Sequence, residues 1–554
     1  MDISIEINDL DNQVEYLLHE NLITEELITD EFLVLTYDYY KEKGYIPIMT
    51  NRILNFILMI FILLLSTVLL CYTNWSEIIN CHRIGNCHEI SIYKETPWYE
   101  NSISNSFLIG YFILGIIFII LNFYLYIKEI CNFYNIRNFY KTLKIDEKEL
   151  SILPWTVVSN KIINYIKQTN PNFNIDILVS RIMRRDNYLI AMINNKIIPD
   201  KMYIFNYEIP IIFSKIFENN IRFVILNNMF TNKNYTRTTF LVSKSGLTFN
   251  FIFIGFLNLI LSPFIVVSTL MFSFLKYTQE FHKNPNSISK REWTPYSLWK
   301  IREYNELTHF FKERVEYSHT YADKYIAQFP NIIESLISKF IVFVVGSFLA
   351  ILICISLIDE RLLLSITIFK RNLLWYIAIF SILISIFKTF VENMNTTRDI
   401  NHKLNNLIDI IHYYPKNWKD NIYSYNTFLE IKNMYRYKFI IFIQEVLSVL
   451  MTPYILIFIM PYHIERIISF VNENTIIVDN IGDICSFSIL DLNIEQLTES
   501  KVKNSILTFY NNHPNWKPKN NIRDFVTSEL DKSNEYLKMK PTEESIIIRS
   551  ILND

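Results

Sequence analysis

Residues 249–275 read FNFIFIGFLNLILSPFIVVSTLMFSFL, a stretch without a charged side chain that is interrupted near its centre by Pro263. Five further apolar runs occur along the chain. They lie at residues 53–72, 107–127, 340–358, 373–387 and 439–461. Apolar runs of about this length are typical of helices that are embedded in lipid. The sequence therefore predicts an all-α integral membrane protein.

The runs at 53–72 and 107–127 contain no charged residue and are predicted as a first transmembrane pair. Each is about 20 residues long, and at a rise of about 1.5 Å per residue such a helix crosses a hydrocarbon core of about 30 Å. The runs at 340–358 and 373–387 are predicted as a second pair.

Pro263 and Pro453 divide the two remaining runs. Proline removes a backbone N–H donor and disrupts the preceding helical turn. Each half of these runs has only about 7 to 14 residues, which is too short to cross a bilayer alone. Each run is therefore either a kinked span or a re-entrant hairpin.

The charge of the loops decides between these two topologies. Residues 128–247 and 277–338 are both rich in Lys and Arg, whereas residues 74–105 contain only Arg83 and Lys94 as basic residues. Because basic loops favour the cytosolic side, both long loops are placed there. The run at 249–275 then enters and leaves by one face. The same reasoning makes the run at 439–461 re-entrant, leaving four transmembrane helices and both termini in the cytosol.

This topology divides the chain into consecutive segments. They are a cytosolic N-terminal segment (1–50), the first transmembrane pair (51–127) with its lumenal loop (74–105), a cytosolic helical region (128–247), the first re-entrant helix (248–276), cytosolic helices (277–338), the second transmembrane pair (339–388), cytosolic helices (389–438), the second re-entrant helix (439–461), a cytosolic C-terminal region (462–520) and a C-terminal tail (521–554).

Composition and motifs exclude several function classes. The formal net charge is −2, so no basic footprint for nucleic acid is present. The sequence contains neither a phosphate-binding Gly-x-x-x-x-Gly-Lys loop nor a His-Glu-x-x-His or Gly-x-Ser-x-Gly motif, and it has only 8 Gly in 554 residues. We therefore predict no catalytic residues, no cofactor and no coupling to ATP.

Cys81 and Cys87 fall in the predicted lumenal loop, where an oxidising compartment would allow a disulfide. His82 and His88 follow them directly, so a zinc site is the alternative. Structural zinc sites usually have tighter Cys-x2–4-Cys spacing, which favours the disulfide, or two free thiols, over a metal.

Two groups of charged residues are candidate functional residues. Arg302, Glu306 and His309 are spaced so that one face of a predicted helix presents all three, although a solvated, salt-bridged helix explains them equally well. Glu445 lies inside an apolar run. An ionisable group there is costly unless it faces water or a partner, so it marks a functional cavity. Lys438 and Arg436 are its candidate partners, and a helix-cap or interfacial role is the alternative.

A series of motifs along the chain resembles one known family. They are Ile182-Met183-Arg184-Arg185-Asp186-Asn187-Tyr188, Lys283-Asn284-Pro285, Arg291 with Trp293, the block from Arg302 to His309, Arg314, Phe329-Pro330, Asp359-Glu360, His412-Tyr413-Tyr414-Pro415 with Trp418, Glu445 with Ser448 and Thr452-Pro453, Gly482-Asp483-Ile484-Cys485-Ser486-Phe487, and Pro514-Asn515-Trp516-Lys517-Pro518. Their order and spacing, from about residue 36 to 520, resemble those of autophagy-related protein 9.

The resemblance implies a domain-swapped homotrimer with four transmembrane and two re-entrant helices per subunit. It implies an ATP-independent phospholipid scramblase on Golgi-derived cytoplasmic vesicles and the preautophagosomal membrane. The implied partners are phospholipids, a lipid-transfer protein of the autophagy-related protein 2 type and autophagy initiation factors.

Some members carry a Lys-Arg-Glu triplet that is linked to lipid movement. The matching positions here are His282, Lys283 and Asn284, so the role is carried chiefly to Lys283. An interfacial lysine that extends towards anionic headgroups would also explain Lys283. The alternative function is a vesicle scaffold that recruits lipid-transfer and initiation proteins without significant scrambling. The sequence shows neither the selectivity element of a channel nor the internal repeat of a transporter.

Overall fold

The computed structural model describes most of the chain, with gaps. The described residues are 28–75, 103–204, 207–230, 236, 240–241, 243–283, 290–329, 332–359, 361–369, 371–388, 391, 399–490, 500–518, 522–524 and 526–528. Helices dominate, and the strands of the described part form four two-stranded antiparallel sheets, which pair β1 with β2, β3 with β6, β4 with β5 and β7 with β8.

The elements of the first half of the chain are α2 (Asp30–Lys41), α3 (Tyr45–Thr67), η2 (Val68–Tyr72), α5 (Ile103–Thr142), η4 (Glu149–Ser151), α6 (Trp155–Ile166), α7 (Ile175–Asn194), β1 (Lys201–Ile204), β2 (Tyr207–Pro210), α8 (Lys215–Ile221), η5 (Arg222–Leu226), α9 (Asn227–Met229) and α11 (Lys244–Lys283). Those of the second half are β3 (Arg291–Trp293), α12 (Pro295–Ile301), α13 (Thr308–Ile326), α14 (Ile332–Ile358), α15 (Leu362–Ser365), β4 (Thr367–Ile368), β5 (Arg371–Asn372), α16 (Leu373–Lys388), α17 (Ile400–Ile411), α18 (Lys416–Asp420), α19 (Tyr425–Met434), β6 (Tyr435–Tyr437), α20 (Lys438–Tyr454), η7 (Ile455–Ile459), α21 (Met460–Glu473), β7 (Thr475–Val478), β8 (Gly482–Cys485), η8 (Ser486–Ser488) and α22 (Ser500–Asn512).

Five helical segments of the described part are long and apolar enough to cross a membrane. They are Tyr45–Leu70, Ile109–Thr142, Lys244–Glu280, Ile332–Ile358 and Lys438–Glu473. A sixth, Leu373–Lys388, is apolar but shorter, with 16 residues or about 24 Å of helix. The prediction of a mostly helical, multi-span membrane protein is confirmed. The division into four spans and two re-entrant helices stays a prediction.

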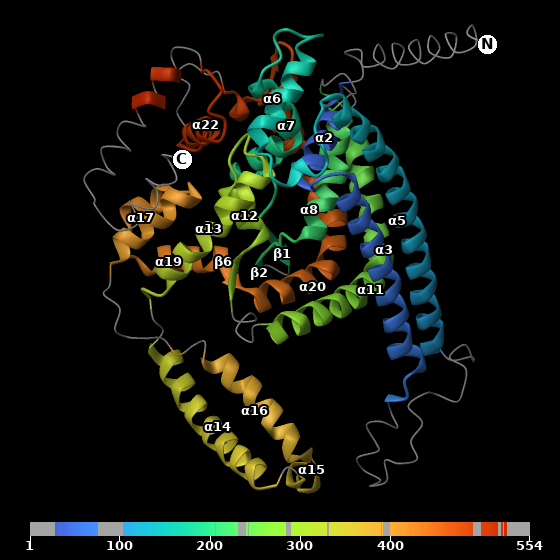
Figure 1. Ribbon diagram of the computed structural model, residues 1–554, viewed down its shortest axis with the longest axis vertical. Coiled ribbons are helices and arrows are strands. Elements are labelled where there is room, and N and C mark those ends of the chain that lie inside the picture. The colour runs from blue at the N-terminus through green and yellow to red at the C-terminus, as the bar shows by residue number, and fades with distance from the viewer. Residues whose placement is uncertain are drawn as a thin grey trace, which may run out of the picture.

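The two proline-containing runs form one antiparallel, bent pair of helices (Figure 1). Gly255 of α11 packs against Ile457 of η7, and Tyr277 packs against Phe442 of α20 with ring centroids 5.4 Å apart. This register brings Pro263 close to the level of Pro453. Figure 1 shows that both helices bend near this level, from a direction along the long axis of the molecule to a direction across it.

Neither proline ends its helix, so each run is one bent helix and not two separate halves. Pro263 lies inside α11, which has 40 residues, and Pro453 lies inside α20, which continues through the π-helical turn η7 into α21. A proline bends a helix when neighbouring structure holds the two halves, and the facing helix does so here.

Helices α3 and α5 form a hairpin that packs against the middle of α11, around Phe264. Its small core contains Leu63, Tyr111 and Phe264, and the hydroxyl groups of Ser66 and Tyr111 are hydrogen-bonded at 2.6 Å. At the other end, the guanidinium of Arg52 donates to both carboxylate oxygens of Glu129 at 2.7 and 3.1 Å. A charge pair at one end of an apolar hairpin is consistent with the edge of a membrane.

The hairpin of α14 and α16 stands apart from α3, α5 and α11 at the lower end of the molecule (Figure 1). Leu352, Leu363 and Leu373 form its local core. Only 6% of the most apolar 18-residue stretch of α14 is buried against other parts of this chain. Its apolar surface is therefore available to lipid or to another chain.

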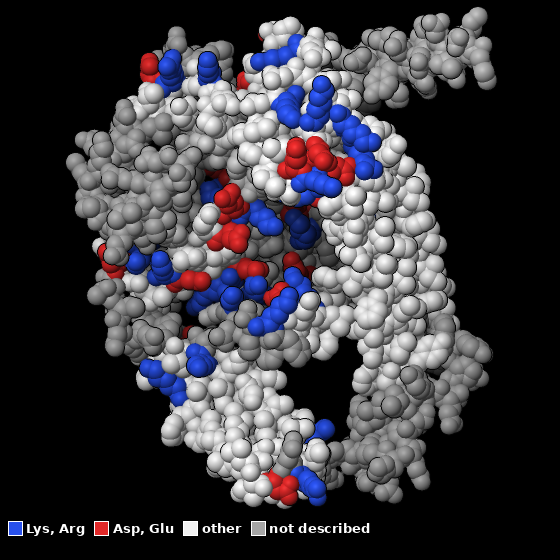
Figure 2. All heavy atoms as spheres, viewed as in Figure 1, with Lys and Arg blue, Asp and Glu red and all other residues white. Residues whose placement is uncertain are grey.

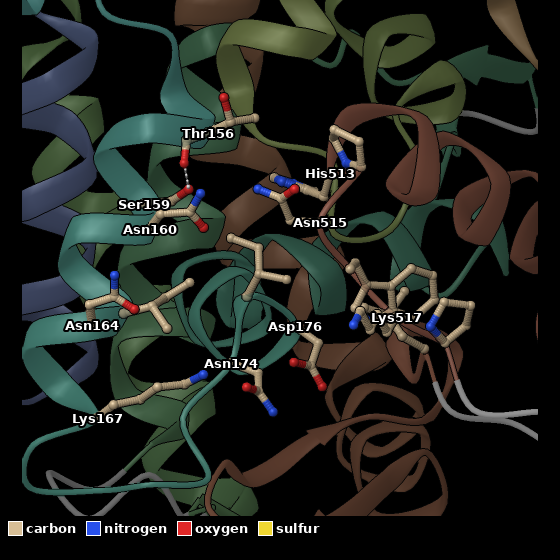
Figure 3. Close-up of a pocket in the computed structure, with 16 residues that line it drawn as sticks. Thr156, Ser159, Asn160, Asn164, Lys167, Asn174, Asp176, His513, Asn515 and Lys517 are labelled. Carbon is tan, nitrogen blue, oxygen red and sulfur yellow. Dashed lines mark hydrogen bonds between the residues drawn. The ribbon is translucent and has the colours of Figure 1, made fainter.

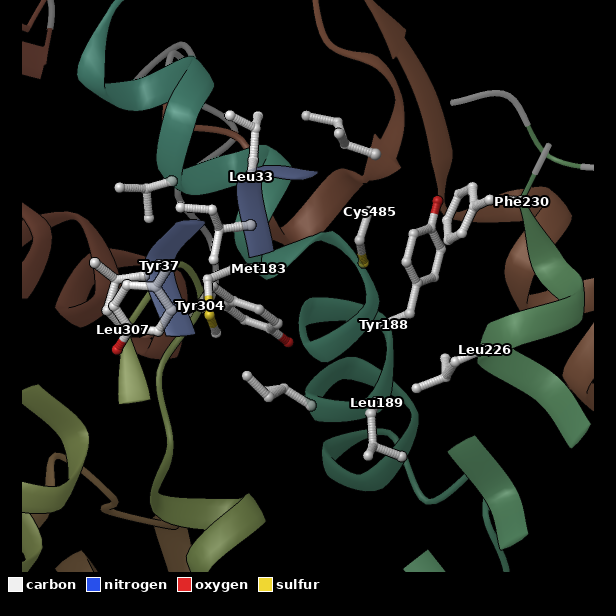
Figure 4. Packing of buried hydrophobic residues seen from close by; sticks show 14 of the residues in the cluster. Leu33, Tyr37, Met183, Tyr188, Leu189, Leu226, Phe230, Tyr304, Leu307 and Cys485 are labelled. Carbon is white, nitrogen blue, oxygen red and sulfur yellow. The ribbon is translucent and has the colours of Figure 1, made fainter. Parts of the chain in front are cut away.

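The part of the chain outside the long apolar helices is built around α7. Buried residues of this helix include Met183, Tyr188 and Leu189, and Figure 4 shows them between Leu33 and Tyr37 of α2 on one side and Phe230 on the other. A helix that is buried on nearly all sides lies in the core of a large domain. A second core, around Trp418 and Tyr435, unites α13, α17 and α19.

Gly255 allows the close approach of α11 to η7, and its replacement tests the bent pair. A Cβ atom at this position would lie 2.5 Å from Ile457 Cγ1 and 3.3 Å from Leu456 Cβ. We expect Gly255→Val to lower the stability by about 1–3 kcal/mol through overpacking, measured as a lower Tm in detergent. Gly110→Ala is the matched control because nothing lies within 4 Å of its added Cβ. An unchanged Tm for Gly255→Val would contradict the packing.

Candidate functional site

The loop between α12 and α13, residues 302–307, carries Arg302 and Glu306 and is not helical, whereas His309 lies in the first turn of α13. Arg302 and Leu307 have extended backbone conformations, and Asn305 has a φ of 55°. The prediction of a helix with Arg302, Glu306 and His309 on one face is therefore wrong. Arg302 and Glu306 nevertheless lie together, because Arg302 Nη2 donates to the Glu306 carbonyl oxygen at 3.3 Å.

Tertiary contacts to α7 hold this loop in place. The Asn187 side chain donates to Asn305 Oδ1 at 2.8 Å, and Asn187 Oδ1 accepts from the Asn305 backbone N–H at 2.9 Å. Asn305 Nδ2 also donates to the Ser488 carbonyl oxygen at 2.7 Å. These contacts satisfy buried polar groups that a continuous helix would have placed elsewhere, so they outweigh the local preference for helix.

Glu306 and Arg314 form a buried bidentate ion pair. Arg314 Nε and Nη2 donate to the two carboxylate oxygens of Glu306 at 2.7 and 2.6 Å, and the Glu303 backbone N–H donates to the same carboxylate at 3.0 Å. The Glu306 side chain is only 1% exposed. Burial opposes the charge on Arg314, but Glu306 outweighs this effect and raises the pKa of Arg314.

Arg302 belongs to a second pair on the same network. Its Nη1 lies 3.0 Å from Asp186 Oδ2, and Arg222 Nη1 donates to Asp186 Oδ1 at 2.7 Å. Burial opposes ionisation of Asp186, but Arg302 and Arg222 outweigh it and lower the pKa of its carboxyl group. We call Asp186, Arg222, Arg302, Glu306 and Arg314 the buried charge network. It cross-links α7, η5, the 302–307 loop and α13.

His309 lies at the edge of the network in an aromatic setting. Tyr37 OH is hydrogen-bonded to His309 Nδ1 at 2.8 Å, and the His309 backbone N–H donates to Tyr37 OH at 3.1 Å. Its Nε2 is buried and has no hydrogen-bond partner among the described residues. Burial lowers the pKa of His309 to about 4, so its imidazole is neutral at physiological pH. The network is thus structural, and its five residues are not among those that line the charged cavity described next.

A large charged cavity lies where α12, α19 and the segment after α7 meet α20. It has a volume of about 690 Å³, and Figure 2 shows basic and acidic side chains gathered in a hollow over the region of α12, β1 and α20. Its charged side chains are Lys196, Asp200, Lys201, Lys300, Glu430, Arg436 and Glu445. A cavity with both signs of charge stays hydrated and can exchange solvent contacts for those of a polar ligand.

Aromatic rings complete the wall of this cavity. Lys300 Nζ lies 4.6 Å from the centre of the Tyr296 ring, and Trp418 Nε1 donates to Glu430 Oε2 at 2.7 Å. The hydroxyl group of Tyr296 is buried without a hydrogen-bond partner in the described structure. Burial and the nearby Lys196 together lower the pKa of Lys300. Lys300 and Tyr296 are thus polar groups whose interactions improve when an anionic or hydrogen-bonding ligand enters.

The predicted candidate residues do not share one site. Glu445 lines the cavity, and it is the only candidate with a described side chain that does so. Lys283 is exposed at the end of α11. The side chain of His282 and all of Asn284 lie outside the description, as do Cys81 and Cys87 of the predicted disulfide.

The predicted partners of Glu445 are wrong. Lys438 Nζ lies 3.0 Å from Glu292 and 3.6 Å from Glu280, and Arg436 donates to Asn433. The antiparallel register draws Lys438 to the end of α11. In the described structure Glu445 forms no ion pair with either of these cations, although Arg436 lines the same cavity.

The cavity residues Lys196, Tyr296, Lys300 and Glu430 were not singled out by the sequence. They come from three separate segments, and none lies in an apolar run where a charge is conspicuous. The motif that contains Tyr413, Pro415 and Trp418 is the sequence feature that could have indicated this cavity, because all three residues line it.

Loss of the Glu306 carboxylate tests the buried charge network. In Glu306→Gln, the neutral amide leaves Arg314 buried without a counter-charge, so we expect a loss of about 3–5 kcal/mol, seen as a much lower Tm. Glu208→Gln is the control, because the 2.7 Å pair of Glu208 with Lys201 is about half exposed and should contribute less than about 1 kcal/mol. Equal effects of the two variants would contradict a structural network.

The buried histidines predict loss of stability in acid. Burial lowers the pKa of both His309 and His513 to about 4, below the value of about 6.5 in an unfolded chain. The two histidines contribute fully to the free energy of unfolding above about pH 6.5. This contribution is lost as the pH falls towards 4, because protons then bind preferentially to the unfolded state. We expect a loss on the order of 1–3 kcal/mol for the two together.

Thermal unfolding of the wild type and of His309→Gln between pH 7.5 and pH 5 measures this effect. Glutamine offers Tyr37 an acceptor but does not titrate, so the fall in Tm with pH should be smaller in the variant. An identical fall in both proteins would exclude a role of His309 in acid stability.

Comparison with known proteins assigns the family. A sequence profile of the family described as Autophagy protein ATG9 matches residues 25–491. Autophagy-related protein 9 of Dictyostelium discoideum is 28% identical over 562 residues, which cover 95% of this chain and 77% of that protein. The protein of the same name from Saccharomyces cerevisiae (strain ATCC 204508 / S288c) is 31% identical over 491 residues, 84% of this chain and 48% of that protein.

The corresponding protein of Cryptococcus neoformans is 29% identical over 531 residues, with 83% of this chain and 53% of that protein covered. The chain thus spans about half the length of several curated relatives that it matches. Among solved structures, the cryo-EM structure of Schizosaccharomyces pombe Atg9 superposes with a TM-score of 0.62 at 28% identity, covering 84% of this chain and 99% of that chain. The profile, the relatives and the shared fold agree that this chain belongs to the autophagy-related protein 9 family.

Proposed function

We propose that this protein is an ATP-independent phospholipid scramblase that equilibrates lipids between the leaflets of autophagy membranes. The observation that carries the proposal is the charged cavity, because one of its walls is α20, a helix that continues into an apolar membrane segment. A phospholipid headgroup cannot cross bare hydrocarbon without losing its hydration, which costs many kcal/mol. A polar surface that reaches membrane helices lowers that cost and needs no energy source.

The chemistry of the cavity suits a phospholipid headgroup. Lys196, Lys300 and the unpartnered hydroxyl of Tyr296 offer contacts to a phosphate, while Glu430 and Glu445 offer contacts to an amine. The bent pair of α11 and α20 supports the same reading, since departures from a straight span occur in membranes where helices are buried in protein or line a wet cavity. The acyl chains would stay in the bilayer while the headgroup moves along the polar surface.

The proposed assembly is a domain-swapped homotrimer with both termini in the cytosol. Support comes from the α14–α16 hairpin, which leaves most of its apolar surface uncovered and stands apart from the other membrane helices of its own chain. A closed ring of three such chains would cover part of this surface and surround a central passage.

The proposed setting is the membrane of cytoplasmic, Golgi-derived vesicles and the preautophagosomal structure. The proposed partners are phospholipids, a lipid-transfer protein of the autophagy-related protein 2 type and autophagy initiation factors. Lipid delivered to the cytosolic leaflet would be redistributed by scrambling. The exposed Lys283, at the end of α11, is positioned to contact headgroups on this route.

A liposome assay tests the proposal directly. The purified chain is reconstituted with a fluorescent phospholipid in both leaflets, and dithionite is added outside without ATP. We expect bleaching to continue well beyond the outer-leaflet lipid, while vesicles that stay sealed to dithionite exclude leakage. Bleaching that stops at the outer leaflet would contradict scrambling and leave the scaffold function.

Variants then locate the path. We expect Glu445→Leu and Lys300→Leu to slow scrambling about 3- to 10-fold, because each removes a polar contact worth on the order of 1 kcal/mol to the passing headgroup. Lys283→Leu should slow it less, since its side chain is exposed. Lys148→Leu, an exposed lysine outside the cavity, is the matched control. Unchanged rates in both cavity variants would exclude this cavity as the path.

A further inference from the structure

A second, polar pocket lies between α6, the beginning of α7 and the segment that follows α22 (Figure 3). It has a volume of about 510 Å³, and the carboxamide groups of Asn160, Asn164 and Asn515 contribute to its lining. None of its lining residues is among the buried polar groups that lack a hydrogen-bond partner in the described structure. The described lining therefore gives no sign of a ligand. The end of the α14–α16 hairpin, in contrast, presents groups that need a partner.

The hairpin of α14 and α16 ends in a short apolar segment. Residues 362–369 read LLLSITIF and contain no charged side chain. They form α15 and β4, and β4 pairs with β5 in a two-stranded antiparallel sheet. Figure 1 shows α15 at the lowest end of the α14–α16 hairpin. We call residues 361–369, 371 and 372 the foot of this hairpin.

Two contacts fix the foot against the beginning of α16. Leu363 is buried in one small core with Leu352 of α14 and Leu373 of α16. The hydroxyl group of Tyr376, in the first turn of α16, donates to the carbonyl oxygen of Ile368 at 2.9 Å. The foot is thus a folded end of the hairpin, and its level relative to α16 is set.

The side chains that the foot turns away from this core are apolar. Phe369 is 91% exposed, and Leu364, Ile366 and Ile368 are exposed as well. Phe369 also has a φ of 44°, in the two-residue turn that joins β4 to β5. Such turns favour Gly, Asn and Asp, because a bulky side chain is strained at positive φ. Phenylalanine at this tip is costly for the turn and in water, so its ring needs an apolar partner.

Two cations accompany these apolar side chains. Arg361 directly precedes α15 and Arg371 lies in β5, and neither guanidinium forms an ion pair within the described part of the chain. The Arg371 guanidinium lies 5.6 Å from the centre of the Trp375 ring, which packs against the ring of Tyr376. Arginine, tryptophan and tyrosine side chains gather at the boundary between membrane and water. A lipid phosphate supplies the anion that the two guanidinium groups lack.

The length of α16 places the foot at the depth of a lipid leaflet. The 16 residues of this helix span about 24 Å, which is less than a hydrocarbon core of about 30 Å. The two extended residues of β5 add about 7 Å. If Lys388 at the end of α16 lies at one boundary of the core, the tip with Phe369 reaches the other. The sheet lies at this boundary and no deeper, since its open edges need water as a hydrogen-bond partner.

We infer that the foot is an interfacial anchor embedded in the lipid leaflet on the far side of the α14–α16 hairpin. Its exposed apolar side chains lie among the outer parts of the acyl chains, and Arg361 and Arg371 bind lipid phosphate groups. The anchor holds the short helix α16 at a fixed depth. In the proposed topology this is the lumenal leaflet. The inference requires that the hairpin crosses the membrane, but it does not depend on scrambling.

Photo-crosslinking from the tip tests the anchor. The full chain with Phe369→p-benzoylphenylalanine is reconstituted in phosphatidylcholine liposomes that contain an alkyne-bearing phosphatidylcholine, and the lipid label on the protein is measured after irradiation. The same substitution at Ile152, which is 85% exposed and lies outside the long apolar helices, is the matched control. We expect at least about 10-fold more label from Phe369, because an interfacial side chain reaches about 5–10 Å into the boundary with the acyl chains.

A change of bilayer thickness then tests the depth. Lipids whose core is about 4 Å thicker should increase the label from Phe369 several-fold, and an equally thin core should decrease it, because the tip lies at the boundary. The label from the same substitution at Ile351, exposed near the centre of α14, should stay constant. Label from Phe369 no higher than from Ile152, crosslinks mainly to a second copy of the chain, or a label that ignores thickness would each overturn the inference.

Discussion

Hydrocarbon offers no hydrogen-bond partner to a polypeptide backbone, and the architecture of this chain follows from that constraint. Every apolar run forms a helix, because a helix satisfies its N–H and C=O groups internally. The two runs that contain proline cannot do so completely. They are paired with each other, so that Pro263 and Pro453 lie at nearly the same level and the two helices bend together. The bend turns α20 across the molecule and makes it a wall of the charged cavity.

Outside the membrane, the organising element is α7. Its apolar side chains fill the main core, and its polar ones, among them Arg184, Asp186 and Asn187, reach three distant parts of the chain. Arg184 donates to backbone carbonyl groups of β8 and of the turn before it, and its Nε donates to Asp30 Oδ2 at 2.5 Å. Asp186 joins η5 to the 302–307 loop. Buried charges of this kind are costly unless every one is paired, so they fix a single arrangement of the segments that they join.

Two separate cavities flank this rigid centre. One contains both signs of charge and lies beside membrane helices. The other is richer in carboxamides and lies at the N-terminus of α7. Both depend on α7, because Lys196 directly after its end lines the first, and Asn174 and Asp176 at its beginning line the second. A rigid helix between the two cavities gives them a fixed separation.

The sequence by itself determined that the chain is a membrane protein and to which family it belongs. Apolar runs are recognised from residues that are adjacent in the sequence, and the family is recognised from the order and spacing of motifs along the chain. It also located a special charge at Glu445, since a carboxylate in an apolar run is conspicuous. It did not predict the broken helix at residues 302–307, because local spacing favours a helix there while Asn187 and Ser488, far away in sequence, stabilise the turn.

Only the tertiary structure decided which charges meet. Arg302 pairs with Asp186 and Lys438 with Glu292, and each of these pairs joins segments more than a hundred residues apart. The charged cavity takes residues from at least five elements, and the polar pocket brings the segment after α22 against α6. Such sites arise from packing over long separations, on which the local pattern of a sequence carries no information.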